Sequence, residues 1–520
     1  MGRAAGILLH PTSLPGPHGI GDLGPGASAF LAWAESAGLR VWQVLPLGPT
    51  GYGNSPYGAL SAFAGNPLLV SPERLAEQGL LPRPALAPRP HFPLDRIDYD
   101  AARTWKERLL RASFAHFRSH APPRLRAAEE AWLEAPEQAF WLADFALFAA
   151  LKGRFEGAAW TDWPPALRRR EPAALAEARR ELRDEIAFHA YAQFLFFRQW
   201  DHLRAQARGR GISILGDVPI YVAADSADVW ARPELFKLAA DGRPRAVAGV
   251  PPDYFSPTGQ RWGNPLYDWR RMARDGYRWW IERLRANLRL ADRVRLDHFR
   301  GFVAHWEIPA REPTAIKGRW VKGPGDRLFA HLLEALGPEL PLVAEDLGVI
   351  TPEVVALRER FGLPGMRVLQ FAFAATPGED SEHAPHRHTP RSVVYTGTHD
   401  NDTSAGWHAA LDPVARQRVD DYLGRGEPIS VRMVRAAYTS VAELAMVPLQ
   451  DFLGLGSEAR MNTPATPAAN WAFRARAEHF APELGAALRR MAELTGRLGA
   501  AAAAGADAAA AAPRPAGAGR

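Results

Sequence analysis

The chain has 520 residues, 47% of them hydrophobic, and its 63 basic and 57 acidic side chains leave a formal net charge of +6. Because basic and acidic residues are interleaved along the sequence, we expect a surface of paired charges and not a continuous basic surface that binds phosphates. We therefore expect no nucleic-acid partner. The absence of cysteine excludes disulfides, thiolate zinc sites and cysteine nucleophiles. The longest uncharged run, Val41–Pro72, is interrupted by Pro and Gly and predicts no membrane helix. With an N-terminus too short in its apolar part for a signal peptide, we expect a soluble cytoplasmic protein.

Short apolar and β-branched runs predict eight strands along the chain. They are Gly6–His10, Val41–Leu45, Ile212–Val218, Arg293–Asp297, Leu342–Glu345, Arg367–Phe373, Ser392–Thr396 and Met446–Asp451. Amphipathic stretches between them, such as Tyr267–Leu290 and Asp326–Leu336, predict helices. Alternating strands and helices in this number predict a (β/α)8 TIM barrel with large, mostly helical insertions. An open doubly wound sheet is the alternative, but no glycine-rich dinucleotide fingerprint follows the first strand.

The spacing of these elements divides the chain into four parts. Residues 1–66 are predicted to form the first part of the barrel, and residues 200–498 its remainder. Between them, a Pro-rich linker at Leu80–Pro93 and helical stretches such as Ala173–Gly209 predict an inserted, mostly helical subdomain over residues 67–199. Residues 499–520 are nearly all Ala and Gly with two Pro, which predicts a disordered tail.

Three of the predicted strands each deliver an acid to the loop that follows: Asp297, Glu345 and Asp400. The carboxyl ends of parallel barrel strands meet on one face, where TIM barrels build their active sites. An acidic site of this kind suits chemistry through a cationic transition state, and glycosidic bond exchange is the leading candidate. A single Asp at a strand end is more often a helix cap or an ion-pair partner. We therefore assign Asp346, Asp402 and Asp228 structural roles.

The neighbours of the acids predict their protonation. Arg295 points to the same side of its strand as Asp297 and is expected to lower the pKa of that carboxyl, as suits a nucleophile. Glu345 follows an apolar strand and lies near a second carboxylate, which is expected to raise its pKa, as a general acid requires. Asp400, next to His399, is placed to bind sugar hydroxyls. His298 is interpreted as a packed histidine or a sugar contact, and no metal-ligand spacing is present.

Longer motifs resemble one family closely over residues 6–474. They are GILLHPTSLPG (Gly6–Gly16), WQVLPLGPTGYGNSPYGALSAFAGNP (Trp42–Pro67), GDVPIYVAADSADVW (Gly216–Trp230), GVPPDYFSPTGQRWGNPLYDW (Gly249–Trp269), RLDHFRGF (Arg295–Phe302), AEDLG (Ala344–Gly348) and GTHDNDT (Gly397–Thr403). The chain resembles the amylomaltases, the 4-α-glucanotransferases or disproportionating enzymes of glycoside hydrolase family 77.

The resemblance implies roles for individual residues. Asp297 would be the nucleophile, Glu345 the acid/base and Asp400 the transition-state stabiliser of a retaining mechanism. The remaining positions that the family uses to bind the donor sugar are Arg295, His399, Asp217, Tyr57 and Asn462, and a capping role for Asn462 is equally open. Tyr52 and Tyr99 match a second, remote glucan site. Family members need no metal or organic cofactor, and we expect none here.

The segment Gly249–Leu266 resembles the family's lid, a loop that arches over the cleft. Tyr254, Phe255 and Trp262 lie within this short span among several Pro and Gly. Aromatic side chains can stack on sugar rings and exclude water from a reactive intermediate. The alternative, especially for Trp262, is an ordinary loop that covers the core.

These observations predict a transferase that moves α-1,4-glucan segments between maltodextrins, with glucose as a possible acceptor, and that closes some chains into rings. A hydrolase of the same clan would share the three acids but would lack the lid. A catalytically silent glucan-binding protein is the third alternative. The presence of Asp297, Glu345 and Asp400 counts against it, because binding alone does not need these acids.

Overall fold

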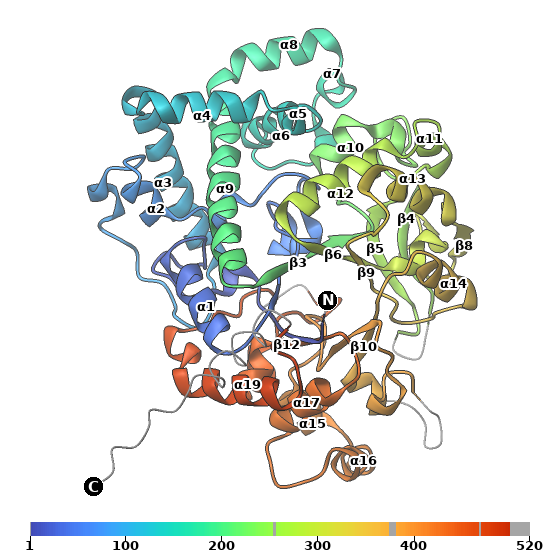
Figure 1. The fold of residues 1–520 in the computed structure, drawn as a ribbon. Helices are drawn as coiled ribbons and strands as arrows, with labels where there is room; N and C mark the ends of the chain where they lie inside the picture. The colour runs from blue at the N-terminus through green and yellow to red at the C-terminus, as the bar shows by residue number, and fades with distance from the viewer. Residues whose placement is uncertain (1, 253–255, 374–380, 467–469, 500–520) are drawn as a thin grey trace, which may run out of the picture.

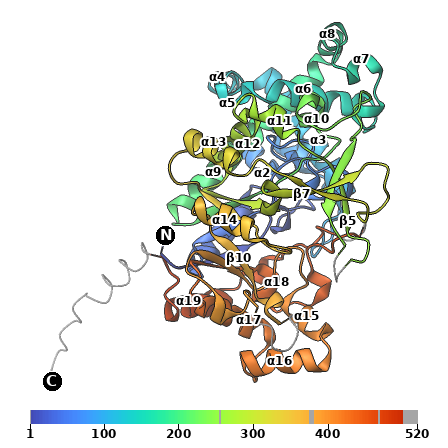
Figure 2. The ribbon, with the colours of Figure 1, turned by 90° about the vertical axis from the view of Figure 1, so that its right-hand side faces the viewer.

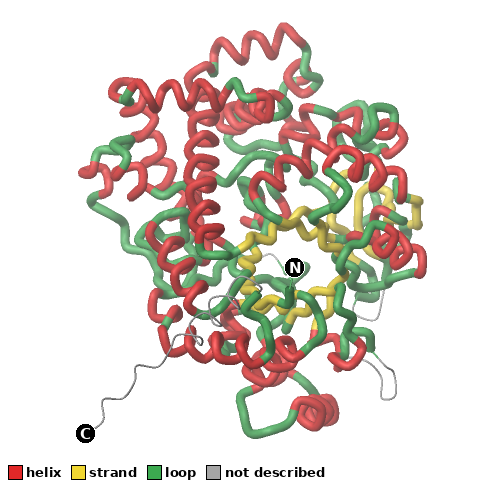
Figure 3. The backbone as a smooth tube through the Cα atoms, in the orientation of Figure 1, coloured by secondary structure: helices red, strands yellow, loops and turns green. Residues whose placement is uncertain are grey.

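The computed structural model describes residues 2–252, 256–373, 381–466 and 470–499. Eight parallel strands form a ring, which Figure 3 shows from one end. In chain order they are β1 (Ala4–Leu8), β2 (Val41–Gln43), β3 (Ser213–Pro219), β6 (Arg293–Asp297), β9 (Leu342–Ala344), β10 (Gly365–Val368), β11 (Ser392–Tyr395) and β12 (Leu444–Pro448). Each strand pairs with the next along the chain except β9 with β10, and β12 returns to β1. The amide of Ala344 donates to the carbonyl of Pro364 at 2.8 Å across that last gap. The predicted (β/α)8 barrel is therefore confirmed.

Helices surround the ring (Figure 1). Those of the barrel and its C-terminal part are α1 (Pro25–Ser36), α10 (Ala227–Ala231), α11 (Trp269–Ala273), α12 (Arg278–Leu290), α13 (Asp326–Leu336), α14 (Pro352–Arg360), α15 (Ser404–Ala410), α16 (Pro413–Leu423), α17 (Ile429–Thr439), α18 (Leu449–Leu453) and α19 (Pro482–Leu494). Between β2 and β3 lie α2 (Pro72–Glu77), α3 (Tyr99–His120), α4 (Pro123–Leu133), α5 (Pro136–Ala139), α6 (Leu142–Arg154), α7 (Pro165–Arg168), α8 (Pro172–Glu181) and α9 (Arg183–Gly209). Figure 2 shows α4–α8 on one side of the barrel and α15–α17 on the opposite side. Among the described residues, none of the helices combines the length and apolar character needed to cross a lipid bilayer.

The barrel strands bury both of their faces, as parallel sheets do. Alternate residues of β1 join different clusters: Ile7 packs with the surrounding helices, and Leu8 packs with Val343, Val368 and Met446 from other strands. This alternation accounts for the near-continuous apolar runs that predicted the strands.

Several predicted boundaries were wrong, and prolines or turns explain them. Arg367–Phe373 was expected to be one strand, but the strand ends at Val368 and a 3-10 helix covers Leu369–Phe373. Likewise, Pro448 ends β12, and the rest of the predicted strand Met446–Asp451 begins α18. Apolar composition alone does not separate a strand from a short buried helix that follows it.

A second sheet was not predicted at all. Four antiparallel strands, in the order β5-β4-β7-β8, form it beside the barrel: β4 (Ala246–Val250), β5 (Gln260–Pro265), β7 (Ala304–Pro309) and β8 (Arg319–Lys322). Part of the segment 249–266, expected to be a loop, belongs to this sheet: its first two residues end β4, and Gln260–Pro265 form β5. Of the predicted disordered tail, residues 499–520, all but Gly499 lie outside the described residues, as do Tyr254 and Phe255.

Candidate active site

Two predicted acids stand side by side where β6 and β9 end. Leu296 pairs with Ala344 in the parallel register, so Asp297 and Glu345 occupy the next position of neighbouring strands. Such strands lie about 4.8 Å apart. Side chains that start from adjacent strand ends can bring their carboxyl groups within the roughly 5–5.5 Å that a retaining glycosidase uses.

Arg295 connects Asp297 to a third, buried carboxylate. Its Nη2 donates to Asp297 Oδ1 at 2.9 Å and to Asp217 Oδ2 at 2.9 Å, and its Nε donates to Asp217 Oδ1 at 3.1 Å. The Asp217 side chain, on β3, is fully buried, and that of Arg295 is 3% exposed. These three hydrogen bonds hold the Nε and Nη2 edge of the planar guanidinium, which restricts its rotation away from the cleft.

The turn after β6 holds Glu345. The backbone N–H of His298 donates to Glu345 Oε2 at 2.6 Å, and that of Leu347 donates to Oε1 at 2.9 Å. His298 has a left-handed backbone, with φ of 53°, a conformation that side chains other than glycine seldom adopt. Both carboxylate oxygens of Glu345 are thereby fixed in direction.

Burial and mutual repulsion set the protonation of this pair. Burial, assisted by the charge of Asp297, raises the pKa of Glu345 to about 8, in agreement with the sequence-based prediction. The prediction for Asp297 was wrong: burial raises the pKa of Asp297, because it outweighs the opposing effect of Arg295, whose charge is shared with Asp217. When the pair holds one proton, we place it on Glu345, since only Asp297 has the guanidinium to stabilise its negative charge.

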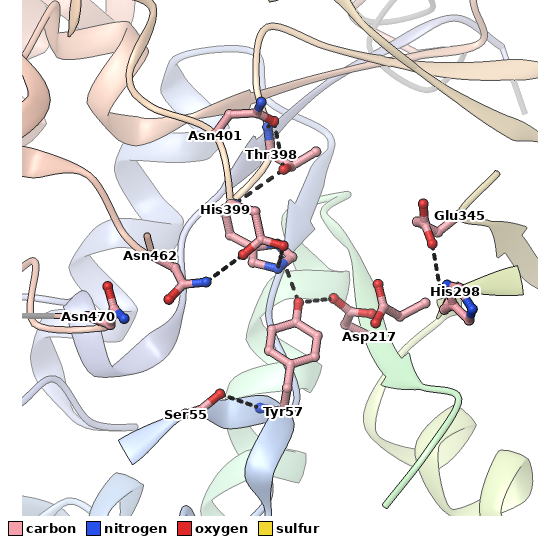
Figure 4. Close-up of polar contacts among 12 residues, drawn as sticks. Ser55, Tyr57, Asp217, His298, Glu345, Thr398, His399, Asn401, Asn462 and Asn470 are labelled. Carbon is pink, nitrogen blue, oxygen red and sulfur yellow. Dashed lines mark hydrogen bonds and ion pairs between the residues drawn. The ribbon is translucent and has the colours of Figure 1, made fainter. Parts of the chain in front are cut away.

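Tyr57 forms the centre of the adjoining polar cluster, which Figure 4 shows. Its hydroxyl donates to Asp217 Oδ2 at 2.7 Å and lies 3.3 Å from His399 Nδ1. The rings of Tyr57 and His399 stack with centroids 4.8 Å apart. Burial, followed by the charge of Asp217, raises the pKa of Tyr57 well above its ordinary value, so the hydroxyl keeps its proton.

Asp400 and Asn462 lie on the far side of Tyr57 from Glu345. Asn462 Nδ2 donates to Asp400 Oδ1 at 2.6 Å, and His399 Nε2 lies 3.4 Å from Asp400 Oδ2. The Asp400 side chain is 49% exposed, whereas His399 is buried. Asn462 therefore orients the carboxylate that faces open solvent. In Figure 4, Asn462 lies on one side of Tyr57, with Glu345 and His298 on the other.

Of the remaining positions predicted from the sequence, some lie near the site and others are outside the described residues. Trp262, on β5, is 38% exposed and lies edge-to-face against His298 with ring centroids 4.8 Å apart, so it borders the site. Tyr99 begins α3 and donates its hydroxyl hydrogen to the carbonyl of Trp471 at 2.9 Å. Tyr254 and Phe255 lie outside the described residues, and so does the side chain of Tyr52.

The structure also adds Trp471, which sequence reasoning missed. Its ring centroid lies 5.8 Å from that of Tyr57 and 5.9 Å from that of His399. Trp471 has a positive φ of 62° and follows no strand, so no local pattern indicated it. The acids treated as structural have structural contacts: Asp228 accepts from the Ala62 amide at 2.8 Å, and Asp346 accepts from the Met366 amide at 2.6 Å.

Comparisons with known proteins agree with this geometry. A family model for glycoside hydrolase family 77, described as 4-alpha-glucanotransferase, matches residues 9–479. The 4-alpha-glucanotransferase of Thermus thermophilus is 54% identical over 505 residues, which are 95% of this chain and 99% of the relative. That of Synechocystis sp. is 50% identical over 499 residues, covering 95% and 98%. The solved amylomaltase from Streptococcus agalactiae in complex with acarbose has a TM-score of 0.91 and 37% identity, with 95% of this chain and 99% of that chain covered. The chain belongs to glycoside hydrolase family 77.

Proposed function

We propose that this 4-α-glucanotransferase moves α-1,4-glucan segments from a donor to an acceptor by a double displacement at Asp297 and Glu345. The observation that carries the proposal is their matching position at the ends of β6 and β9, where Arg295 donates a hydrogen bond to Asp297. One carboxylate is stabilised as an anion, while burial keeps the other protonated. A retaining mechanism needs these two states, an ionised nucleophile and a protonated general acid.

In the first step, the Asp297 carboxylate attacks the anomeric carbon of the donor. The glycosidic bond breaks, its oxygen takes the proton of Glu345, and a covalent glycosyl ester remains on Asp297. In the second step, Glu345 accepts the proton of an acceptor hydroxyl, whose oxygen attacks the same carbon and releases Asp297. Retention follows from two inversions at one carbon.

The surrounding residues stabilise the charge that develops on the sugar. Asp400 presents an exposed carboxylate, oriented by Asn462 at 2.6 Å, which we assign to the hydroxyls of the donor sugar. Tyr57 and His399 offer a stacked pair of rings beside it, suited to the apolar face of a pyranose. We further propose that Tyr52 and Tyr99 belong to a second glucan site.

Transfer requires that an acceptor hydroxyl reach the glycosyl ester before water does. We assign this selectivity to the segment 249–266, because Trp262 contacts His298, whose backbone amide donates to Glu345. Maltodextrins and glucose are the expected substrates, and a chain's own end acting as acceptor would give a cyclic glucan.

We also infer a cytoplasmic location and a role in glycogen and maltodextrin metabolism. The support is chemical: the chain contains no cysteine, and its proposed substrates are storage glucans and their fragments. Fractionation of cells that express the full chain would test the location.

Incubation of the purified protein with maltotriose alone tests the proposed function. Glucose and a ladder of longer oligomers, at a constant total of reducing ends, are expected. A rising total with only shorter products would instead establish a hydrolase. Binding of maltotriose without any product would establish the glucan-binding alternative.

A further inference from the structure

The tryptophans of this chain are almost all covered. Of 17 tryptophans, every one within the described residues, only Trp262 and Trp320 are exposed as large hydrophobic side chains, at 38% and 40%. Both belong to the four-stranded sheet beside the barrel, Trp262 on β5 and Trp320 on β8. An exposed indole does not contribute the free energy that its burial would give. Two exposed indoles on one small sheet therefore suggest that the sheet binds a ligand.

The same turn anchors both tryptophans. Trp262 contacts His298, the residue after Asp297, edge-to-face. The guanidinium of Arg300, two residues further on, lies over the ring of Trp320 at 3.8 Å from its centroid. Both exposed indoles thus contact the turn that directly follows the proposed nucleophile, Asp297.

The Trp320 ring is held in place although it is exposed. Arg300 is itself buried, and its Nη1 donates to the carbonyl of Val349 at 2.6 Å, in the loop after Glu345. Trp306 packs against Trp320 from the paired position of β7, edge-to-face at 5.2 Å. A preoriented aromatic side chain costs little conformational entropy when a ligand stacks on it.

We propose that Trp320 is an outer binding position for the α-1,4-glucan chain, on the Glu345 side of the cleft. The inference rests on the proposed function, because Glu345 must stand beside the glycosidic oxygen of the leaving or accepting chain. Trp262 borders that side, whereas Asn462, which is hydrogen-bonded to Asp400, lies on the other. β5 and β8 are the two edges of the sheet, three strand spacings or ~14 Å apart. A single glucose cannot bridge that distance, but an oligosaccharide can.

The proposal predicts a dependence on acceptor length. With amylose as donor, Trp320→Ala is expected to raise the KM for maltotetraose and longer acceptors about tenfold, equivalent to 1.4 kcal/mol. The KM for glucose as acceptor should stay unchanged. Trp320→Phe keeps an aromatic face and should recover most of the affinity for long acceptors. Tyr422→Ala, which removes another exposed aromatic side chain at 45% exposure on α16, serves as the matched control.

The outcomes separate this inference from the proposed function. An equal loss with glucose and with long acceptors, together with a lower melting temperature, would mean that Trp320 only covers Arg300, and the proposal would be wrong. An unchanged KM for every acceptor would also overturn it. Absence of transfer in the unaltered protein would instead refute the proposed function.

Discussion

Asp297 and Glu345 stand at matching positions of neighbouring strands, and the residue after the first acid binds the second. The His298 amide donates to Glu345 Oε2 at 2.6 Å, while Asp297 accepts from Arg295 at 2.9 Å. Strand β6 and the turn that follows it therefore position both carboxyl groups, with Arg295 hydrogen-bonded to Asp297 and a backbone amide to Glu345. This asymmetry is the basis of the first two predictions.

Asp297→Asn should abolish transfer while the protein still binds glucans. The amide cannot form the glycosyl ester, and we expect a loss of at least about a thousandfold in kcat, or ~4 kcal/mol in the activation barrier. Arg295 keeps its two contacts with Asp217, so the fold should persist. Product analysis with maltotriose and calorimetric titration with maltoheptaose would check both statements. Asp326→Asn, at an exposed position on α13, is the control; normal turnover of the Asp297 variant would exclude this residue as nucleophile.

Activity should fall as the pH rises through about 8. Glu345 must be protonated to act as an acid, and its pKa in the folded protein is about 8. The group has no cation of its own to hold a negative charge, so its ionisation ends the first step. A kcat/KM profile from pH 5 to 10 would measure this limb. An alkaline limb several units away from 8 would show that another group governs it.

Glu345→Gln should change the dependence of stability on pH. Because the pKa of Glu345 in the folded protein is raised above its ordinary value of 4.5, protonation favours the folded state, and this contribution is fully present below pH 4.5. It is lost as the pH rises through the folded pKa of about 8. The melting temperature of the variant, relative to that of the unaltered protein, should therefore rise as the pH is raised from 5 to 8. A constant difference over this range would contradict the raised pKa.

Asp217→Ala should destabilise the protein as well as inactivate it. The substitution removes one of the two carboxylates around a guanidinium whose side chain is 3% exposed, and loss of a buried partner costs about 3–5 kcal/mol. Urea unfolding would measure the loss. Asp217→Asn keeps the volume and an acceptor oxygen, so it should cost less stability than Ala. Equal stability of all three proteins would mean that Asp297 alone compensates the charge of Arg295.

Part of this structure could be predicted from sequence because it depends on local pattern. The strand Arg293–Asp297 and the helix Asp326–Leu336 agree with their predicted bounds, since apolar periodicity marks both. Two strands of the second sheet gave no such signal, because Gln260–Pro265 and Arg319–Lys322 are at least half exposed and carry several polar residues. The two halves of the sheet are joined by the pairing of Ala246–Val250 with Ala304–Pro309, which lie far apart in the chain and which a short window cannot connect.

In the candidate site, too, the residues that follow a local sequence pattern were predicted and the others were not. Its acids follow buried strands and were predicted, although their roles stay proposals. The direction of the Asp297 pKa shift was missed because the sequence could not show that burial outweighs the effect of Arg295, which also binds Asp217. Trp471 and the contact of His298 with Glu345 depend on left-handed backbone conformations, which no residue pattern indicated.

Arg497 should contribute strongly to stability far from the cleft. Its guanidinium is fully buried and donates to five carbonyl oxygens, those of Ala4, Ala437, Tyr438, Ser440 and Ala442. These join the first barrel strand to the C-terminal end of α17, where the helix dipole favours a cation.

Arg497→Ala would leave those carbonyls buried without their donor, and we expect a loss of about 3 kcal/mol or more in the free energy of unfolding. Arg497→Lys retains the charge but cannot reach all five oxygens, so an intermediate loss is expected. Arg490→Ala, which truncates a 70% exposed side chain on α19, is the matched control and should change the free energy by less than about 0.5 kcal/mol. Urea unfolding of the three variants, with transferase activity measured on each, would separate this effect from the chemistry. A loss for Arg497→Ala no larger than that of the control would show that water replaces the guanidinium at these carbonyls.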